Sequence, residues 1–245
     1  MLSYMHKASA TGVSGQMTSN KLYRHVKRSF DFVLSGMGIV ILSPLLLIIA
    51  LWIKCDSKGP VFFKQKRFGQ NKVFFEILKF RTMRIDAPHD VPTHLLSDPY
   101  AFITKSGHFL RKTSLDELPQ LFNIFVGQMS IIGPRPALWN QLDLIEERDK
   151  YNANAIRPGL TGWAQVNGRD ELLISDKARF DGEYARHMSF KMDWSCFWLT
   201  VGGVLKSKGI VEGGTGVMAK QRKKRQTEIQ DASLASDVQD EGISR

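Results

Sequence analysis

The sequence contains few cysteines and no recognisable export signal. Its 245 residues include only two cysteines, Cys55 and Cys196. Two isolated cysteines match no metal-ligand spacing and offer no disulfide framework, which is typical of a protein in a reducing compartment. Residues 1–20 lack the charged start, apolar run and small-residue cleavage site of a signal peptide. We therefore predict a flexible N-terminal arm over residues 1–26.

Acidic residues are too few to balance the basic ones. The chain has 34 Lys and Arg against 24 Asp and Glu, which gives a formal net charge of +10. Such an excess indicates a polyanionic partner, and nucleic acid, anionic lipid and phosphorylated substrates all fit this description. The length and the 43% hydrophobic content predict one sizeable folded domain rather than general disorder.

One long apolar run lies between Phe30 and Ile53. A straight helix over this run would be about 36 Å long, enough to cross a hydrocarbon core of about 30 Å. Pro44 divides it into legs of roughly 21 and 15 Å, each too short to cross by itself. A bend there would free backbone carbonyls at membrane depth, and either Ser43 or ordered water could satisfy them.

Basic residues flank this apolar run on both sides, and positive charge prefers the cytoplasmic side of a membrane. We therefore predict a re-entrant helix-break-helix with both ends in the cytoplasm. A single span with a proline kink and a buried core helix stay open as alternatives. The flanking basic residues are Lys21, Arg24, His25, Lys27 and Arg28 before the run and Lys54, Lys58, Lys64, Lys66 and Arg67 after it.

The segments 61–67 and 72–83 are rich in β-branched and aromatic residues and are separated by Gly69-Gln70-Asn71. This pattern predicts a β-hairpin. In its second strand Lys79 and Arg81 are two residues apart, so both side chains lie on one face and could bind an anion together. A basic strand face that is simply solvated explains the same pattern.

An acidic pair, Asp116 and Glu117, precedes apolar residues at helical spacing. We predict a helix that begins at this pair, with Pro119 in its first turn. Acidic residues at a helix start also act as ordinary caps, so the pair has a structural explanation as well. Further on, Arg135 lies between two prolines, which predicts a stiff turn suited either to oxyanion binding or to a carboxylate contact.

An amphipathic helix rich in aromatic residues is predicted near residues 193–208. Trp194, Phe197 and Trp198 share one face of it, and such a face fits either core packing or the membrane interface. After Gly216 a basic cluster and a Ser-, Asp- and Gln-rich stretch predict a disordered tail over residues 217–245, whose basic part suits an anionic leaflet. The remaining residues, 27–216, would form the membrane hairpin and the folded domain.

Taken together in this order, the motifs resemble the monotopic phosphoglycosyl transferases, a family of bacterial sugar transferases. The resemblance covers roughly residues 27–216, and the probability that five motifs occur in this order by chance is very small. The motifs are Lys27-Arg28-Ser29-Phe30-Asp31, Lys79-Phe80-Arg81-Thr82-Met83, Ser114-Leu115-Asp116-Glu117-Leu118-Pro119-Gln120, Met129-Ser130-Ile131-Ile132-Gly133-Pro134-Arg135-Pro136, and residues 157–170.

The resemblance implies a small α/β (α+β) catalytic domain with an N-terminal re-entrant membrane helix-break-helix and interfacial amphipathic helices. It also implies transfer of a sugar 1-phosphate from a UDP-sugar to polyprenyl phosphate, commonly undecaprenyl phosphate, with Mg²⁺, at the cytoplasmic face of a bacterial membrane. The chain lacks the multi-span N-terminal extension of larger relatives, so we expect a minimal member. A homodimer is a candidate assembly.

By the same resemblance Asp116 would be the nucleophile and Glu117 its metal-binding neighbour. Asp181 would assist at the metal, and the phosphate-binding residues would be Lys79, Arg81, Arg111, Arg135 and Arg169. Two other classes compete with this hypothesis. A lipid-binding scaffold needs no acid pair beside arginines, and a nucleic-acid binder leaves the apolar run unexplained, so we expect no nucleic-acid partner.

Overall fold

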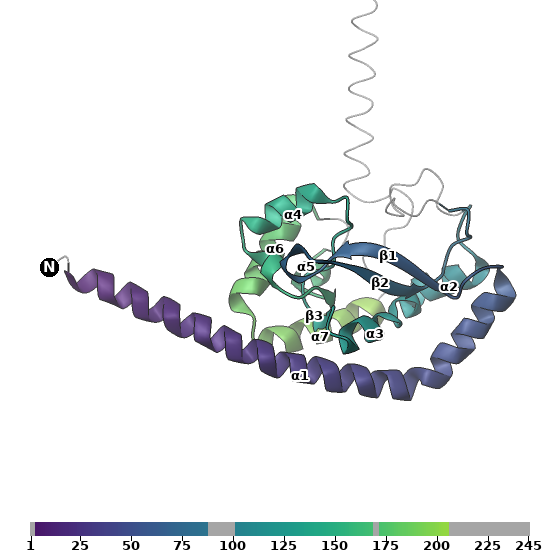
Figure 1. Cartoon of the computed structure of the whole chain (residues 1–245), viewed down its shortest axis with the longest axis horizontal. Coiled ribbons are helices and arrows are strands. Elements are labelled where there is room, and N and C mark those ends of the chain that lie inside the picture. Colours follow the sequence, from purple (N-terminus) through teal and green to yellow (C-terminus); the bar gives the residue numbers. More distant parts are fainter. Residues whose placement is uncertain (1–2, 88–100, 169–171, 206–245) are drawn as a thin grey trace, which may run out of the picture.

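The computed structural model describes residues 3–87, 101–168 and 172–205, with side chains from residue 22 to residue 203 within those ranges. It has an α+β architecture in which a β-hairpin and a pair of short parallel strands are surrounded by helices (Figure 1). The predicted mixture of helix and small sheets is confirmed. The division of the chain into three regions stays a prediction, and the tail at 217–245 lies outside the described residues.

Helix α1 runs from Ser3 to Asp56 and includes Pro44. The structure differs here from the predicted helix-break-helix, because α1 continues through Pro44 without interruption. Proline has no N–H to donate to the carbonyl four residues earlier, which is that of Val40. The Ser43 hydroxyl donates to this carbonyl at 2.8 Å instead, as expected for a satisfied bend. Within the described residues, Leu22–Asp56 is one helix long and apolar enough to cross a membrane.

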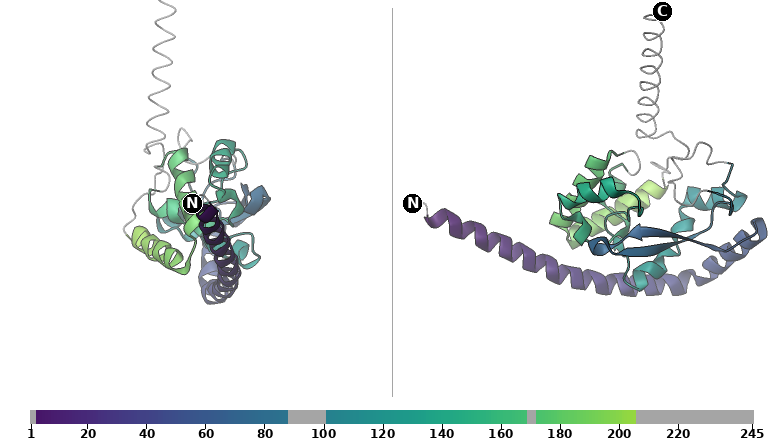
Figure 2. Two further views of the ribbon diagram at one scale, coloured as in Figure 1. Left: turned by 90° about the vertical axis from the view of Figure 1, so that its left-hand side faces the viewer. Right: turned by 45° about the horizontal axis from the view of Figure 1, so that its top comes forward.

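Both ends of the apolar part of α1 are attached to the same domain. Before Pro44, Asp31 accepts hydrogen bonds from the Ser130 hydroxyl at 2.7 Å and from the Ile131 N–H at 3.0 Å. After it, Ile53 is buried in the core and Asp56 accepts a hydrogen bond from the Ser106 N–H at 2.8 Å. Figures 1 and 2 show α1 curving along one side of the domain between these attachments.

The predicted hairpin is confirmed as β1 (Phe62–Phe68) and β2 (Phe74–Phe80). The strands are antiparallel, with Phe62 opposite Phe80 and Phe68 opposite Phe74. The connection contains the short 3₁₀ turn η1 (Gln70–Lys72), in which Asn71 has a positive φ of 54°. Asparagine tolerates this left-handed conformation better than most residues, which explains its place in the turn.

Two glycine motifs meet where the parallel strands β3 (Ser130–Ile132) and β4 (Gly159–Thr161) pair. A Cβ on Gly159 would lie 2.1 Å from the Gly133 nitrogen, so the two backbones touch at a distance that only glycine allows. The Gly-Pro-Arg-Pro and Arg-Pro-Gly-Leu-Thr-Gly sequences are therefore neighbours in space, and their glycines are required for close packing.

The remaining helices cover the strands and complete the core. They are α2 (Lys105–Thr113), α3 (Gln120–Phe125), α4 (Leu142–Asp149), α5 (Trp163–Val166), α6 (Ile174–His187) and α7 (Phe190–Leu205), with the 3₁₀ turns η3 (Leu115–Glu117) and η4 (Ala153–Ala155). Both cysteines are unpaired, as predicted; Cys196 is buried and Cys55 is exposed.

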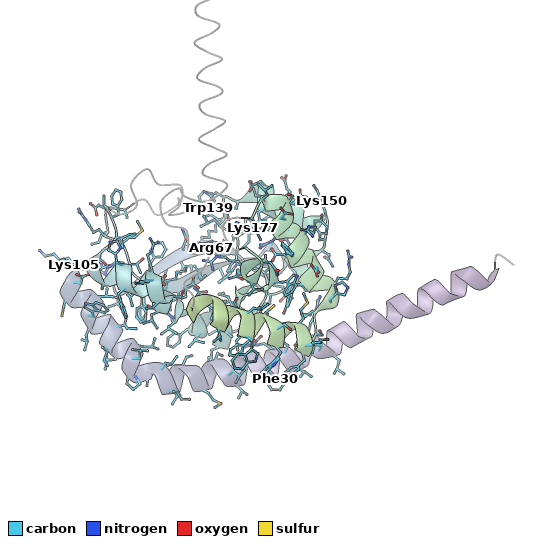
Figure 3. All side chains as sticks on the ribbon, turned by 180° about the vertical axis from the view of Figure 1, so that it is seen from behind. Phe30, Arg67, Lys105, Trp139, Lys150 and Lys177 are labelled. Carbon is cyan, nitrogen blue, oxygen red and sulfur yellow. The ribbon has the colours of Figure 1, made fainter. Side chains whose placement is uncertain are left out.

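Many large apolar side chains stay exposed on α1, α3 and α7. Trp194 and Trp198 of α7 are 53% and 54% exposed, so the membrane interface explains this helix better than core packing. Figure 3 shows Phe30 on the outer side of α1 near α7, and this side chain is 57% exposed. An apolar surface of this kind fits association with a membrane.

Candidate active site

The acidic pair lies in the 3₁₀ turn η3, between α2 and α3. The predicted helix does not begin at Asp116, because α3 starts at Gln120 with Pro119 as its N-cap residue. Ser114, which ends α2, has a left-handed φ of 56° and redirects the chain into the turn. The acids are therefore presented from a sharp corner, and they do not cap the first turn of a longer helix.

Glu117 is bound by two cations from different parts of the chain. Its Oε1 accepts from Lys79 Nζ at 2.7 Å and from Arg135 Nη2 at 3.2 Å. Burial by itself would raise the pKa of Glu117, but Lys79 and Arg135 outweigh burial and lower it well below its ordinary value. Glu117 is thus a carboxylate at any physiological pH, and its side chain remains 20% exposed.

Asp116 has the opposite shift. Burial raises its pKa most, Lys79, Arg111 and Arg135 act to lower it, the negative charge of Glu117 acts to raise it, and the net result is a pKa of about 6. Two adjacent carboxylates thus titrate in separate ranges. The pair consists of a permanently charged Glu117 and an Asp116 that loses its proton near neutral pH, beside three cations.

The three cations reach the acids from separate elements. Lys79 lies in β2, Arg111 in the last turn of α2, and Arg135 in the turn after β3. The structure brings these three predicted residues together around Asp116 and Glu117. It describes no position for Arg169, which lies outside the described residues, so the role of that residue stays a prediction.

Arg81, the predicted partner of Lys79, is directed elsewhere. Its guanidinium donates to the carbonyls of Lys58 and Ser57 at 2.6 and 2.7 Å, and to the Ser57 hydroxyl at 2.8 Å. Only 5% of Arg81 is exposed. In this structure Arg81 attaches the end of β2 to the connection between α1 and β1.

Asp181 is buried in an ion pair with a residue that the sequence did not single out. Arg148 donates to Asp181 Oδ2 through Nε at 2.8 Å and through Nη2 at 2.6 Å. The same Nη2 donates to the backbone carbonyl of Arg135 at 2.9 Å. Asp181 therefore fixes Arg148, and Arg148 fixes the turn that carries Arg135. These contacts fit a positioning role for Asp181 better than the predicted contact with a metal.

The comparison with protein families agrees with this site. The family model described as "Bacterial sugar transferase" matches residues 22–207. The chain belongs to the bacterial sugar transferase family. The match includes α1 from Leu22 onward, the acid pair and the turn that carries Arg135, so the predicted resemblance is confirmed.

Several bacterial sugar transferases in other organisms are similar to this chain. The undecaprenyl-phosphate glucose phosphotransferase of Komagataeibacter xylinus is 41% identical over 186 residues, which cover 71% of this chain and 35% of that protein. The UDP-glucose:undecaprenyl-phosphate glucose-1-phosphate transferase of Escherichia coli K12 is 39% identical over 73% of this chain and 40% of its own length. The exopolysaccharide production protein ExoY of Sinorhizobium fredii is 35% identical over 75% and 87%.

The aligned region is less than half of the length of some of these relatives. The chain spans 42% and 35% of the proteins from Haemophilus influenzae and Komagataeibacter xylinus. The sugar transferase match supports membership in the family, and the reaction has to be argued from the site.

A Mg²⁺ ion, as the family resemblance implies, fits the acid pair. In proteins this ion is commonly held by one or two carboxylates together with substrate phosphates, rather than by an all-protein cage. Among the residues that the structure describes, no group of three or more His, Cys, Asp or Glu side chains is arranged to hold a metal. The adjacent Asp116 and Glu117 carboxylates agree with an ion held by one or two carboxylates, in which the phosphates of the sugar donor supply the remaining oxygens.

Proposed function

We propose that this protein transfers a sugar 1-phosphate from a UDP-sugar to polyprenyl phosphate, commonly undecaprenyl phosphate, and releases UMP. The observation that carries the proposal is the acid pair surrounded by Lys79, Arg111 and Arg135. The name of the Escherichia relative contains both a UDP-sugar and undecaprenyl phosphate, and the name of the Komagataeibacter relative contains undecaprenyl phosphate and glucose. The reaction would be the first membrane step of exopolysaccharide, capsule or glycoconjugate synthesis.

The charges around the acid pair suit attack on an anionic substrate. A carboxylate that approaches a diphosphate meets a repulsion of about 4 kcal/mol for each like-charge pair at 4 Å and an effective dielectric constant near 20. Among the described residues, three cations beside two carboxylates leave a positive surplus at the site. That surplus lowers the cost of bringing the diphosphate to Asp116 and stabilises charge that develops on the leaving group.

In the proposed first step an Asp116 carboxylate oxygen attacks the phosphorus that carries the sugar. The new bond is an acyl phosphate, and the diphosphate P–O bond breaks with its electron pair leaving on UMP. In the second step an oxygen of polyprenyl phosphate attacks the same phosphorus and expels the Asp116 carboxylate. The first step needs Asp116 ionised, which its pKa of about 6 permits at neutral pH, and the second step releases Asp116 again as the carboxylate.

Glu117 would hold Mg²⁺ together with the donor diphosphate. When bound, the ion would supply neutralisation of the phosphate charge. Glu117 is suited to this contact because its pKa is well below the ordinary value, so the carboxylate stays charged. Lys79 and Arg135 would contact donor phosphate oxygens from the positions in which they now bind Glu117.

We propose further that the protein is monotopic and works at the cytoplasmic face of the membrane. The support is the attachment of both flanks of the apolar segment to one domain, through Asp31 on one side and Asp56 on the other. A segment that crossed the bilayer would place these two attachments on opposite faces. The exposed apolar side chains of α1, α3 and α7 would enter the membrane from the same side.

The covalent step can be tested with the acceptor withheld. Purified full-length protein is incubated with Mg²⁺ and a radiolabelled UDP-sugar, UDP-glucose first because relatives are named for it. We expect UMP release up to one equivalent and a labelled sugar phosphate on the peptide that contains Asp116. Kinetics that require both substrates before any UMP appears, together with no adduct in intact-protein mass spectrometry, would replace the two-step scheme by direct transfer. Membranes that release no UMP from any UDP-sugar would refute the proposed reaction.

The topology can be tested with cysteines on the two flanks. Cys55 is exposed in the native sequence, and Ser29→Cys places a second thiol before the apolar run in a Cys55→Ser background. We expect an impermeant maleimide to label neither site in intact cells and both sites after permeabilisation. Labelling of one site only in intact cells would demonstrate a single crossing.

A further inference from the structure

A cavity of about 260 Å³ lies beside the N-terminal part of α1, outside the acid-pair site. Its lining contains four cations, Arg24, Lys27, Arg28 and Arg157, and one carboxylate, Asp31. Arg157 begins the Arg-Pro-Gly-Leu-Thr-Gly motif, whose glycines are explained by backbone packing but whose arginine has no part in the proposed reaction. We refer to this space as the basic cavity.

Among the residues that the structure describes, the positive charge of the basic cavity is only partly balanced. Asp31 is 3% exposed, and its two oxygens already accept from Ser130 and Ile131. Lys27 is paired with Asp193 at 2.6 Å, so its charge is compensated. Arg28 donates only to neutral acceptors, the carbonyls of Ile124 and Phe125, each at 2.7 Å.

Arg24 and Arg157 are the least satisfied of the four cations. Within the described part of the chain neither forms a salt bridge, and the Nε of each is buried without a hydrogen-bond partner. Burial lowers the pKa of Arg157, and the nearby charge of Arg28 lowers it further, while Asp31 acts in the opposite direction. Guanidinium groups that repel one another around a cavity are stabilised by a bound anion, and their planar donors match phosphate oxygens.

The basic cavity is separate from the acid pair. Gln70, in the hairpin turn, lines the cavity, whereas Lys79 lies near the other end of the hairpin, opposite Phe63. The five-residue step from Phe63 to Phe68 alone spans about 17 Å of strand. A molecule in the basic cavity would therefore not occupy the position of the reacting phosphates.

The basic cavity borders the exposed apolar face. Phe30, 57% exposed, lies three residues after Lys27 on α1, and residues three apart are neighbours on a helix surface. Trp194 of α7 is the next residue after Asp193, which binds Lys27. Cations next to apolar side chains are the arrangement expected at the level of lipid headgroups. The chemistry that fits is a phosphate ester attached to acyl chains.

We propose that the basic cavity binds the phosphate of one anionic phospholipid headgroup, a lipid distinct from both substrates. Arg24 and Arg157 provide the free guanidinium donors, and Arg28 adds charge while it attaches α1 to α3. The bound headgroup would fix the depth of α1 at the cytoplasmic leaflet. This inference does not depend on the proposed reaction.

The test compares the double variant Arg24→Gln/Arg157→Gln with wild type and with Arg84→Gln/Arg179→Gln. The control pair loses the same charge at exposed sites, since the side chains of Arg84 and Arg179 are 59% and 57% exposed. Each full-length protein is reconstituted in nanodiscs of phosphatidylcholine with increasing phosphatidylglycerol, and retained lipid is counted by native mass spectrometry. We expect wild type and control to retain one phosphatidylglycerol, with roughly tenfold weaker retention by the double variant.

Two outcomes would overturn the proposal. Equal retention by all three proteins would show that the basic cavity does not select the lipid. Calorimetric binding of inorganic phosphate in pure phosphatidylcholine nanodiscs, lost in the double variant and with no preference for phosphatidylglycerol, would identify a free phosphate as the ligand. If the double variant does not fold, as judged by thermal unfolding, the single variants Arg24→Gln and Arg157→Lys are measured in the same way. Retention equal to wild type in both would then count against the proposal.

Discussion

The acid-pair site and the Arg148–Asp181 pair both join carboxylates to guanidinium groups. They differ in the exposure of their side chains and in the balance between positive and negative charge. The Asp181 and Arg148 side chains are 1% and 6% exposed, and they pair directly with each other. The Glu117 side chain is 20% exposed, and three cations surround two carboxylates at its site. Balanced and sealed charges fix a backbone, here the turn at Arg135. Surplus positive charge that remains accessible is available to an anionic substrate.

The largest expected effect is that of Asp116→Asn. The amide keeps the shape of the side chain but cannot form an acyl phosphate, so transfer should fall on the order of a thousandfold or more. Binding of the UDP-sugar should persist, because the three cations remain. Measurements are UMP release and equilibrium dialysis of the donor, with Asp176→Asn on the exposed face of α6 as the matched control. Retained transfer would reduce Asp116 to a structural residue of the turn.

The second prediction concerns the buried Arg148–Asp181 pair. Arg148→Gln removes the cation that pairs directly with Asp181 and should destabilise the protein by about 3–5 kcal/mol. Burial already raises the pKa of Asp181 despite Arg148, and the substitution should raise it further. In the variant the pKa of Asp181 in the folded protein lies farther above its value in the unfolded chain. The loss in the free energy of unfolding therefore grows as pH rises from about 4. Urea unfolding should therefore show that Arg148→Gln loses more stability at pH 7 than at pH 5. The control variant Arg84→Gln should lose little stability at either pH.

The double variant Arg148→Met/Asp181→Leu separates stability from positioning. Replacement of both charges by apolar side chains of similar size should recover most of the stability. The carbonyl of Arg135 still loses its donor, so the KM for the UDP-sugar should rise while the protein remains folded. A double variant with wild-type KM would show that Arg148 does not position Arg135.

The third prediction concerns Glu117→Gln. Turnover should fall roughly ten- to hundredfold through weaker metal binding, and added Mg²⁺ should recover part of it. The matched control is Glu76→Gln, since Glu76 is an exposed acid that pairs with Lys64 at 3.4 Å. A loss of turnover that no Mg²⁺ concentration changes would assign Glu117 to holding Lys79 and Arg135 alone.

The smallest expected effect is a shift in the pH profile. A protonated Asp116 is not a nucleophile, so formation of the adduct should fall as pH decreases through about 6. The charge of Glu117 helps to raise the pKa of Asp116, so Glu117→Gln should move this midpoint to lower pH. Single-turnover UMP release between pH 4.5 and 8 measures both profiles. An unchanged midpoint in the variant would show that the two acids do not interact.

Local patterns in the sequence determined the hairpin, the apolar helix, the aromatic helix and the family. Alternation of side chains, proline and turn residues act over a few positions, so they can be interpreted without a fold. Lys79, Arg111, Arg135, Asp116 and Glu117 followed from motifs that matched the family, and the structure brings them together.

The tertiary structure alone decided how buried charges are paired. Arg81 and Asp181 resemble site residues in sequence, yet one binds the carbonyls of Ser57 and Lys58 and the other binds Arg148, 33 positions away. The continuation of α1 through Pro44 without a break and the convergence of Arg28 and Arg157 on one cavity were equally hidden. The physical reason is that the partner of a buried polar group is chosen by proximity in the fold, because burial makes any unpaired group costly, and sequence separation carries no information about that proximity.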